Sequence, residues 1–353
     1  MVKMTMTLRS RALVPILLAA NLGIGCTAGV APTVLPAFAT TAVPAPADTV
    51  FVTSDSWAAK AGGTFELFSA GANPQATRLT FCSGCQALTA SPSLDRTRLA
   101  LRRVDADTNR DGRLDDFDRV SLLLVDLAKR IEGPFLPDGW TSSSADWSSD
   151  GTFLVHTSSP DGSADDLYQI DSNAQNNQRL LNTPNVRERG ARLNTAITRV
   201  VYERIDGTGA GKSEIWVFAS TSNQVKITDS GIVGDLLPAS LYRVGSDAGP
   251  DYSPDGASVV FRRLTSASIA GGAWDILVVT STGGVPRVIA SGPLFRSAPD
   301  WGKDGIVFSE QNPSTGGMDV VVIDPATGAR RVLQSFPSGY KAGPPRWIAG
   351  VAG

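Results

Sequence analysis

A twelve-residue segment, 107–118, carries oxygen-bearing side chains at the spacing of an EF-hand calcium loop. The ligand positions of such a loop are occupied by Asp107, Asn109, Asp111, Arg113 (through its backbone carbonyl), Asp115 and Asp118. Gly112 stands where the loop must turn sharply, and Asp118 replaces the longer Glu that usually closes the site. Hard oxygen ligands suit Ca²⁺, so the spacing predicts a structural and rather weak calcium site. The alternative is an acidic hairpin loop that is merely solvated.

Cys82 and Cys85 form a C-x-x-C pair. In an exported protein such a pair closes most readily as a local disulfide, and this is our prediction. A thioredoxin-like redox role would need the pair at the start of a helix in a βαβ unit, and the neighbouring residues do not provide one. A free or metal-binding pair is the remaining alternative.

No catalytic residue is predicted. His156 is the one histidine of the chain, and it ends a predicted strand where other repeats carry Tyr202 and Phe261, so we interpret it as a packing residue. The glycine-rich segment 206–213 resembles a phosphate-binding loop. However, Asp206 stands where that motif needs glycine, and a strand pattern follows where it needs a helix. No G-x-S-x-G nucleophile elbow occurs.

A repeated unit of about 50 residues must position these side chains. Its clearest copies are Ala145–Gly151, Pro250–Gly256 and Pro299–Gly305. Each copy has an aromatic residue, then an Asp-Gly turn, then a short aliphatic strand. Weaker copies keep the spacing, and the aligned slots for the aromatic residue are Pro92, Trp147, Leu193, Tyr252, Trp301 and Trp347.

Two further strand patterns follow each turn, as in Asp275–Val279 and Pro286–Ile289. Four short strands per unit, without a sustained 3.6-residue apolar period, predict an all-β fold built of four-stranded propeller blades. The segment from Asp48 begins at a second strand, 50–52, whereas 345–348 reads as a first strand without the rest. Together they complete one blade, which predicts six blades in a ring closed by the C-terminal strand.

These units resemble the exported TolB-like propeller repeat, whose blade reads roughly W-S-P-D-G, strand, D-I-Y, strand, L-T. The nearest copy is Tyr252–Gly256 followed by Asp275–Leu277, and the resemblance covers about residues 48–353. It implies a six-bladed propeller of PD40-type, WD40-like repeats in an exported bacterial lipoprotein. TolB also carries an α/β domain ahead of its propeller, where this sequence has a charge-free tail, so we do not expect a role in the Tol–Pal system.

The N-terminus reads as an export signal. Three basic residues, Lys3, Arg9 and Arg11, precede an apolar run at 12–24 that is too short to span a bilayer comfortably. In the interpretation we favour, 22–26 is a lipobox and Cys26 becomes a lipidated N-terminus. In the other, cleavage after Ala39 at an A-x-A site releases a soluble secreted protein. The predicted organisation is a signal peptide at 1–25, a tether at 26–47 and the propeller at 48–353, with the calcium loop inserted at 107–118.

Composition narrows the function. The 353 residues include 32 Lys and Arg against 34 Asp and Glu, a formal net charge of −2, so no basic excess is available for nucleic acid. The leading hypothesis is a non-enzymatic, monomeric scaffold at the periplasmic or outer cell surface, which touches the membrane only through its lipid anchor and binds a protein or a glycan. The alternatives are a hydrolase or lyase acting on a sugar or lactone, and a calcium-stabilised secreted structural module. Convergent carboxylates or a metal in the central channel would indicate an enzyme, and an aromatic or apolar mouth would indicate a binder.

Overall fold

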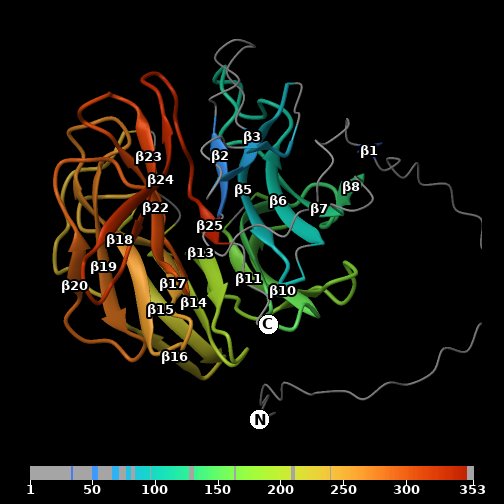
Figure 1. Cartoon of the computed structure of the whole chain (residues 1–353). Coiled ribbons are helices and arrows are strands. Elements are labelled where there is room, and N and C mark those ends of the chain that lie inside the picture. The colour runs from blue at the N-terminus through green and yellow to red at the C-terminus, as the bar shows by residue number, and fades with distance from the viewer. Residues whose placement is uncertain are drawn as a thin grey trace, which may run out of the picture.

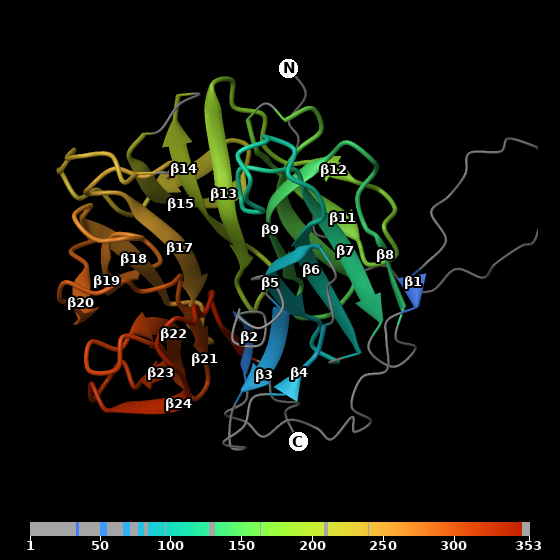
Figure 2. The same ribbon diagram turned by 90° about the horizontal axis from the view of Figure 1, so that it is seen from above.

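The computed structural model describes residues 33–34, 50–54, 66–70, 77–80, 84–95, 97–126, 131–162, 164–207, 211–238 and 240–347. Every regular element within these ranges is a β-strand, which confirms the predicted all-β class. In the same part of the chain there is no helix of the length and apolarity needed to cross a membrane. The sheets stand around a common axis like the blades of a propeller (Figures 1 and 2).

Five of the sheets have four antiparallel strands, as predicted. Four of these sheets are made of consecutive strands. The first two are β9 (Thr141–Trp147), β10 (Phe153–Ser159), β11 (Asp166–Asp171) and β12 (Gln178–Arg179), then β13 (Val186–Leu193), β14 (Val200–Asp206), β15 (Ser213–Ser220) and β16 (Asn223–Lys226); the next two are β17 (Asp247–Tyr252), β18 (Ser258–Ser266), β19 (Ala273–Thr280) and β20 (Arg287–Ala290), then β21 (Asp300–Gly302), β22 (Gly305–Gln311), β23 (Met318–Ile323) and β24 (Arg330–Phe336). The fifth combines the last strand, β25 (Arg346–Trp347), with β2 (Val50–Ser54), β3 (Glu66–Ala70) and β4 (Thr77–Arg78).

The remaining sheet departs from the prediction because it has five strands. Its members are β5 (Gln86–Pro92), β6 (Arg98–Val104), β7 (Val120–Asp126), β8 (Ile131–Pro134) and β1 (Thr33–Val34). Strand β1 comes from the predicted tether and pairs antiparallel with β8, Thr33 opposite Glu132. The expectation of six four-stranded blades is therefore wrong in this respect, since five sheets have four strands and the outer edge of this one is covered by an added strand.

The ring is closed by the two ends of the propeller segment, as the sequence predicts. Strand β25 pairs antiparallel with β2, with Val50 opposite Trp347 and Phe51 opposite Arg346. Figure 1 shows β25 beside β2. Closure of this kind removes the unpaired edges and bare faces that an open row of blades would expose.

The hydrophobic core lies between neighbouring sheets. One cluster joins Val201 of β14 and Ile215 of β15 to Tyr252 of β17 and Phe261 of β18 in the next sheet. Another joins Phe68 of β3 to residues of β22 and β23 and to Trp347. Because each sheet is apolar on both faces, its strands read as aliphatic runs, and every sheet depends on its two neighbours for burial.

The Asp that precedes the aromatic slot in three copies connects one sheet to the next. Asp146 accepts a hydrogen bond from the backbone N–H of Leu193 (3.0 Å), and Asp251 accepts one from that of Trp301 (2.7 Å). Asp300 does the same for Trp347 (2.8 Å). The acceptor in one sheet thus satisfies the donor at the slot of the following sheet, a role that the sequence analysis did not assign.

Candidate functional site

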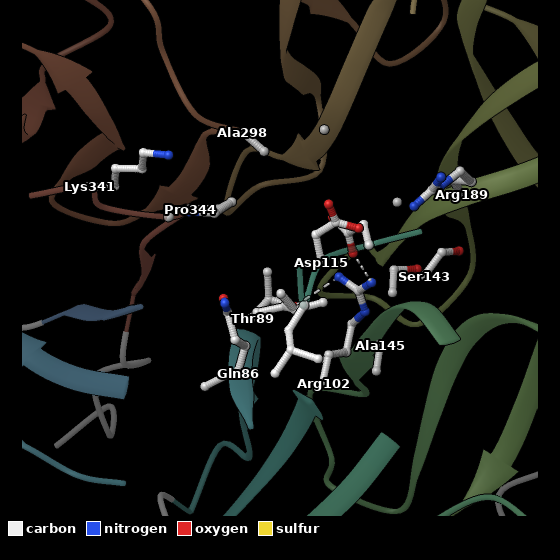
Figure 3. Close-up of a pocket in the computed structure, with 18 of the residues that line it drawn as sticks. Gln86, Thr89, Arg102, Asp115, Ser143, Ala145, Arg189, Ala298, Lys341 and Pro344 are labelled. Carbon is white, nitrogen blue, oxygen red and sulfur yellow. Dashed lines mark hydrogen bonds and ion pairs between the residues drawn. The ribbon is translucent and has the colours of Figure 1, made fainter. Parts of the chain in front are cut away.

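A pocket of about 970 Å³ opens where the inner strands begin. Its wall is formed by residues of the inner strands β5, β9, β13 and β17 and by segments that precede β17, β21 and β25. The EF-hand-like loop, residues 107–118, adds residues 112–116 from the connection between β6 and β7. In Figure 3 the side chains of Arg102 and Arg189 reach this pocket from two sheets, and that of Lys341 comes from the connection between β24 and β25.

Four inner strands break register with their neighbours at equivalent places. The residues skipped are Leu88 in β5, Ser143 in β9, Gly190 and Ala191 in β13, and Gly249 and Pro250 in β17. Such bulges bend the strand and redirect side chains. Beside them lies one repeated position of the second strands, occupied by Arg102, Thr157, Glu203 and Arg262. Three of these four, Arg102, Glu203 and Arg262, line the pocket.

Glycine is required at two of these bulges. Gly190 has φ +63°, and a Cβ there would lie 2.7 Å from Oε1 of Glu203. Gly249 has φ +60°, and a Cβ there would lie 2.4 Å from the Cβ of Ala298. Both positions combine a left-handed backbone with contact too close for any side chain, so the pocket wall depends on them.

Arg102 is buried, at 5% exposure, and its guanidinium is held in several directions. Nε donates to the carbonyl of Ser142 (3.0 Å), and Nη1 donates to the hydroxyl of Thr89 (3.4 Å). Nη2 donates to Oδ1 of Asp116 (2.6 Å). These three contacts therefore fix the orientation of the Arg102 side chain.

Arg262 occupies the repeat position of Arg102 in another sheet. Its guanidinium stacks over Trp274, with 4.0 Å between Cζ and the ring centroid, and Nη1 donates to the carbonyl of Arg296 (3.0 Å). Its Nε has no hydrogen-bond partner among the described residues. Arg189 of β13 lines the same pocket, and its Nε lies 3.8 Å from Oδ2 of Asp165.

The acidic residue Glu203 is fully engaged. Oε1 accepts a hydrogen bond from the backbone N–H of Gly249 (2.6 Å), and Oε2 accepts one from the hydroxyl of Tyr242 (2.8 Å). Glu203 is 4% exposed, so it serves to hold the bulge of β17 and the Tyr242 loop in place. Its charge also offsets part of the positive charge of the pocket.

Asp116 reaches into the pocket from the EF-hand-like loop, and its side chain stays 52% exposed. Desolvation acts to raise the pKa of this carboxyl group. The charges of Arg102, Arg189 and Arg262 outweigh that effect, so the pKa lies below its usual value. We call these three residues the arginine triad; they come from β6, β13 and β18 and all act on one carboxylate.

The predicted calcium ligands lie together in that loop, which the structure describes in full. Asp107 accepts hydrogen bonds from the backbone N–H groups of Asp111 (3.2 Å) and Gly112 (2.9 Å). Gly112 has φ +85°, in keeping with the predicted sharp turn. Asp118 is 5% exposed and accepts from the N–H groups of Thr108 (2.7 Å) and Asp115 (3.0 Å).

The side chains of the loop do not converge on one point. Among the described residues, no group of three or more His, Cys, Asp or Glu side chains is arranged to hold a metal ion. The donor set of Asp107, Asn109 and Asp111 is chemically suited to Ca²⁺, and the loop backbone folds around it, whereas Arg113 and Asp115 turn toward the pocket wall. The calcium site stays a prediction.

The cysteines can be followed only in part. Cys85 is disulfide-bonded. Cys82, its predicted partner, lies outside the described residues, as does Cys26. The pairing and the lipid attachment stay predictions.

His156 lies in β10, inside a sheet and not in the pocket. It is 0% exposed and stacks on Tyr168, with 5.3 Å between ring centroids. Nδ1 lies 2.8 Å from the hydroxyl of Ser158, and Nε2 lies 3.0 Å from Oδ1 of Asn177. Burial lowers the pKa of His156 to about 4. This agrees with the interpretation of His156 as a packing residue.

The glycine-rich segment is followed by β15 (Ser213–Ser220), a strand, so a phosphate loop, which needs a helix there, is excluded at this position. Two carboxylates, those of Asp251 and Asp300, do lie close enough to influence each other. Burial raises the pKa of Asp251 and Asp300, that of Asp300 to about 6, and the charge of Asp300 raises the pKa of Asp251 further. Both already accept the inter-sheet N–H groups of Trp301 and Trp347, which assigns them to the framework.

Charged side chains share the lining of the pocket with Tyr242 and with apolar residues such as Leu88 and Leu114, so it is not the purely aromatic or apolar mouth expected of a binder. Sequence reasoning missed the arginine triad. Aligning the second strands of the repeats would have placed Arg102, Glu203 and Arg262 at one position, two residues after Ala100, Val201 and Val260. No comparable alignment of the repeats would have pointed to Arg189 or Asp116.

Solved structures with the same arrangement of sheets decide the fold type. TolB from Acinetobacter baumannii superimposes with a TM-score of 0.62 at 15% identity, over 86% of this chain and 67% of that chain. The fold is a TolB-like β-propeller. A putative TolB from Agrobacterium tumefaciens gives a TM-score of 0.55 at 14% identity, over 82% of this chain and 89% of that one.

A chain of a nidogen/laminin complex also shares the propeller fold, with a TM-score of 0.57 at 9% identity, over 83% of this chain and 98% of that chain. No family model matches the sequence, and no curated protein matches it. At these identities the likeness concerns the fold, and the function of this propeller must be argued from its own residues.

Proposed function

We propose that the six sheets are the six blades of one closed ring, and that this ring is a non-enzymatic binding scaffold of the cell envelope. The observation that carries the proposal is the pocket of about 970 Å³, into which the arginine triad is aimed from three sheets. Rigid strands that present oriented charges favour recognition of a protein or a glycan that carries anionic groups. The pocket then takes the place of the apolar mouth that the sequence analysis expected of a binder.

The residues of the pocket support binding better than catalysis. Glu203 has both carboxylate oxygens engaged, and Asp116 is paired with Arg102. His156, the one imidazole of the chain, is buried in another part of its sheet. General acid–base catalysis needs a titratable group within reach of the substrate, and these groups are committed elsewhere.

The calcium loop, the anchor and the monomeric state belong to the same proposal. Ca²⁺ would be held by side-chain oxygens of Asp107, Asn109 and Asp111, with Asp115 and Asp118 drawn in, and it would stiffen the loop at the mouth of the pocket. A lipid on Cys26 would keep a monomeric propeller at the periplasmic or outer face of a membrane.

The test uses a photo-crosslinking amino acid at two positions of the full-length protein in its native host. Lys341 lines the pocket in the connection between β24 and β25, whereas Val285, 96% exposed, lies in the connection between β19 and β20. In four-stranded antiparallel blades these two connections lie at opposite ends of the ring. We expect a discrete adduct from position 341 that is lost in Arg189→Gln, and no such adduct from position 285. Equal adducts from both positions, or turnover of an envelope sugar by the pure protein, would overturn the proposal.

A further inference from the structure

Asp116 stands among the arginine triad as an anionic ligand would. It accepts a hydrogen bond from Arg102 at 2.6 Å, and the charges of Arg189 and Arg262 act on it as well. Its own segment is a loop between β6 and β7, whereas the triad belongs to strands of three sheets. The carboxylate thus belongs to a loop, whereas the guanidinium groups belong to strands of the ring.

The triad is a built site. Arg102 is fixed by the carbonyl of Ser142, and Arg262 is fixed by the carbonyl of Arg296 and by stacking on Trp274. The Nε of Arg262 lacks a hydrogen-bond partner among the described residues and is buried. A planar guanidinium with unused donors matches a carboxylate, which can accept two parallel hydrogen bonds.

The charges of the pocket are unbalanced. Arg192 and Lys341 line it in addition to the triad, whereas its acidic members are Asp115, Asp116 and Glu203. Glu203 is engaged by Tyr242 and Gly249. Asp165 lies 3.8 Å from Arg189 but does not line the pocket, so Asp116 is the lining carboxylate that pairs with the triad, through Arg102. The Asp116 side chain is 52% exposed although Arg102 is buried, so an incoming carboxylate can approach this ion pair from the solvent side and exchange with Asp116.

Resting on the proposed function, we propose that the pocket binds an acidic peptide segment of a partner protein, and that Asp115 and Asp116 are a built-in competitor for the same arginines. The competitor is itself a short peptide, Leu114–Phe117, in which Leu114 is half-buried and Phe117 is 46% exposed. A pocket of about 970 Å³ has room for a segment of a few residues. The loop therefore sets the affinity of the pocket by occupying it, and a partner must displace Asp116 to bind.

The test measures binding of a fluorescent probe to the full mature protein by anisotropy. The probe is the blocked peptide Leu-Asp-Asp-Phe, and the control probe is Leu-Asn-Asn-Phe. Removing the competitor with Asp116→Asn should tighten binding of the acidic probe about tenfold, whereas Arg262→Gln should weaken it by at least about tenfold. The matched control is Asp138→Asn, which removes the same charge at an exposed residue that does not line the pocket, and it should leave binding unchanged.

The outcomes separate this inference from the proposed function. Equal binding of both probes, or an unchanged or weaker affinity in Asp116→Asn, overturns the competitor role. If a polygalacturonate oligomer binds in a triad-dependent manner and the acidic peptide does not, the peptide specificity is wrong while the pocket remains a binding site. If Arg189→Gln abolishes the adduct at position 341 but does not change the affinity for the acidic peptide probe, the partner is not an acidic peptide. If the native protein gives no adduct at position 341, the proposed function itself is wrong.

Discussion

The carboxylate of Asp300 accepts a hydrogen bond from the backbone N–H of Trp347 at 2.8 Å, and this contact ties the last strand of the ring to the sheet before it. The same carboxylate also binds Nη1 of Arg346. Asp300 is 8% exposed, and Trp347 sits in turn against Gly302 and donates its indole N–H to the carbonyl of Gly305. Ring closure therefore depends on a buried polar contact in addition to the pairing of β25 with β2.

Asp300→Ala should destabilise the ring. It leaves the N–H of Trp347 and the guanidinium of Arg346 buried without their acceptor, which costs about 2–4 kcal/mol of unfolding free energy. Urea denaturation followed by tryptophan fluorescence measures the loss. Asp255→Ala, at an exposed turn, is the control and should cost about 1 kcal/mol or less. Equal losses in both variants would show that the contact at Trp347 contributes nothing to closure.

Gly249→Ala should damage both stability and the pocket. The residue has φ +60°, and the new Cβ would overlap the Cβ of Ala298, so we expect a loss of about 2 kcal/mol or more in unfolding free energy. Gly256→Ala is a matched control, because Gly256 has φ +71° but its nearest neighbouring atom would lie 3.7 Å away. It should cost only about 1 kcal/mol, the strain of the backbone alone. If the two variants unfold at the same urea concentration, close packing at this bulge is refuted.

His156 should make stability fall at acidic pH. Burial lowers its pKa to about 4 in the folded protein, whereas the unfolded chain has the ordinary value of about 6.5. Below pH 6.5 the unfolded state binds more protons, so unfolding free energy decreases as pH falls from about 6.5 to 4, by about 3 kcal/mol in all. Above pH 6.5 this residue contributes no pH dependence.

His156→Phe removes this titration while keeping an aromatic side chain, as Phe261 does at the equivalent position of another sheet. Urea unfolding at several pH values should therefore show a shallower dependence between pH 4 and 6.5 in the variant than in the native protein. Parallel curves for the two proteins would mean that the pKa of His156 is the same in the folded and the unfolded state.

Calcium should stabilise the protein through the EF-hand-like loop. Ligand that binds only the folded state at 100 times its dissociation constant adds about 2.7 kcal/mol, which raises the melting temperature by a few degrees in a domain of this size. Mg²⁺ should do less, since it resists dehydration. The double variant Asp107→Ala and Asp111→Ala should lose the shift, and Asp138→Ala should keep it. Calorimetry without heat or shift at millimolar Ca²⁺ would identify the loop as a solvated acidic hairpin.

Lipid attachment at Cys26 is tested in the bacterial host. Metabolic labelling with a fatty-acid analogue should mark the native protein and spare Cys26→Ala, because the thiol of the new N-terminus is the site of acylation. Labelling of both proteins to the same extent, or a mature N-terminus at Thr40, would assign the chain to the ordinary secretory route.

The sequence by itself determined the strands and their order. The Asp-Gly turns at 150–151 and 255–256 and the aliphatic runs after them are local signals, and Ser148 and Ser253 each hydrogen-bond to the Asp two residues on, as local turn chemistry requires. The incomplete repeat units at the two ends of the propeller segment also predicted the pairing of β25 with β2. Packing in a propeller repeats from blade to blade, so one well-read copy predicts the others.

Only the tertiary structure decided what the ring surrounds. Arg102, Arg189 and Arg262 come from sheets far apart in the sequence, and they line one pocket because closure of the ring brings their strands around a common axis. The bulges at Gly190 and Gly249 that open the pocket depend on Glu203 and Ala298, their neighbours in space. The pairing of Thr33–Val34 with β8 likewise joins distant segments. Such contacts have no local period to reveal them, since their energy depends on burial and charge that exist only after the chain has closed.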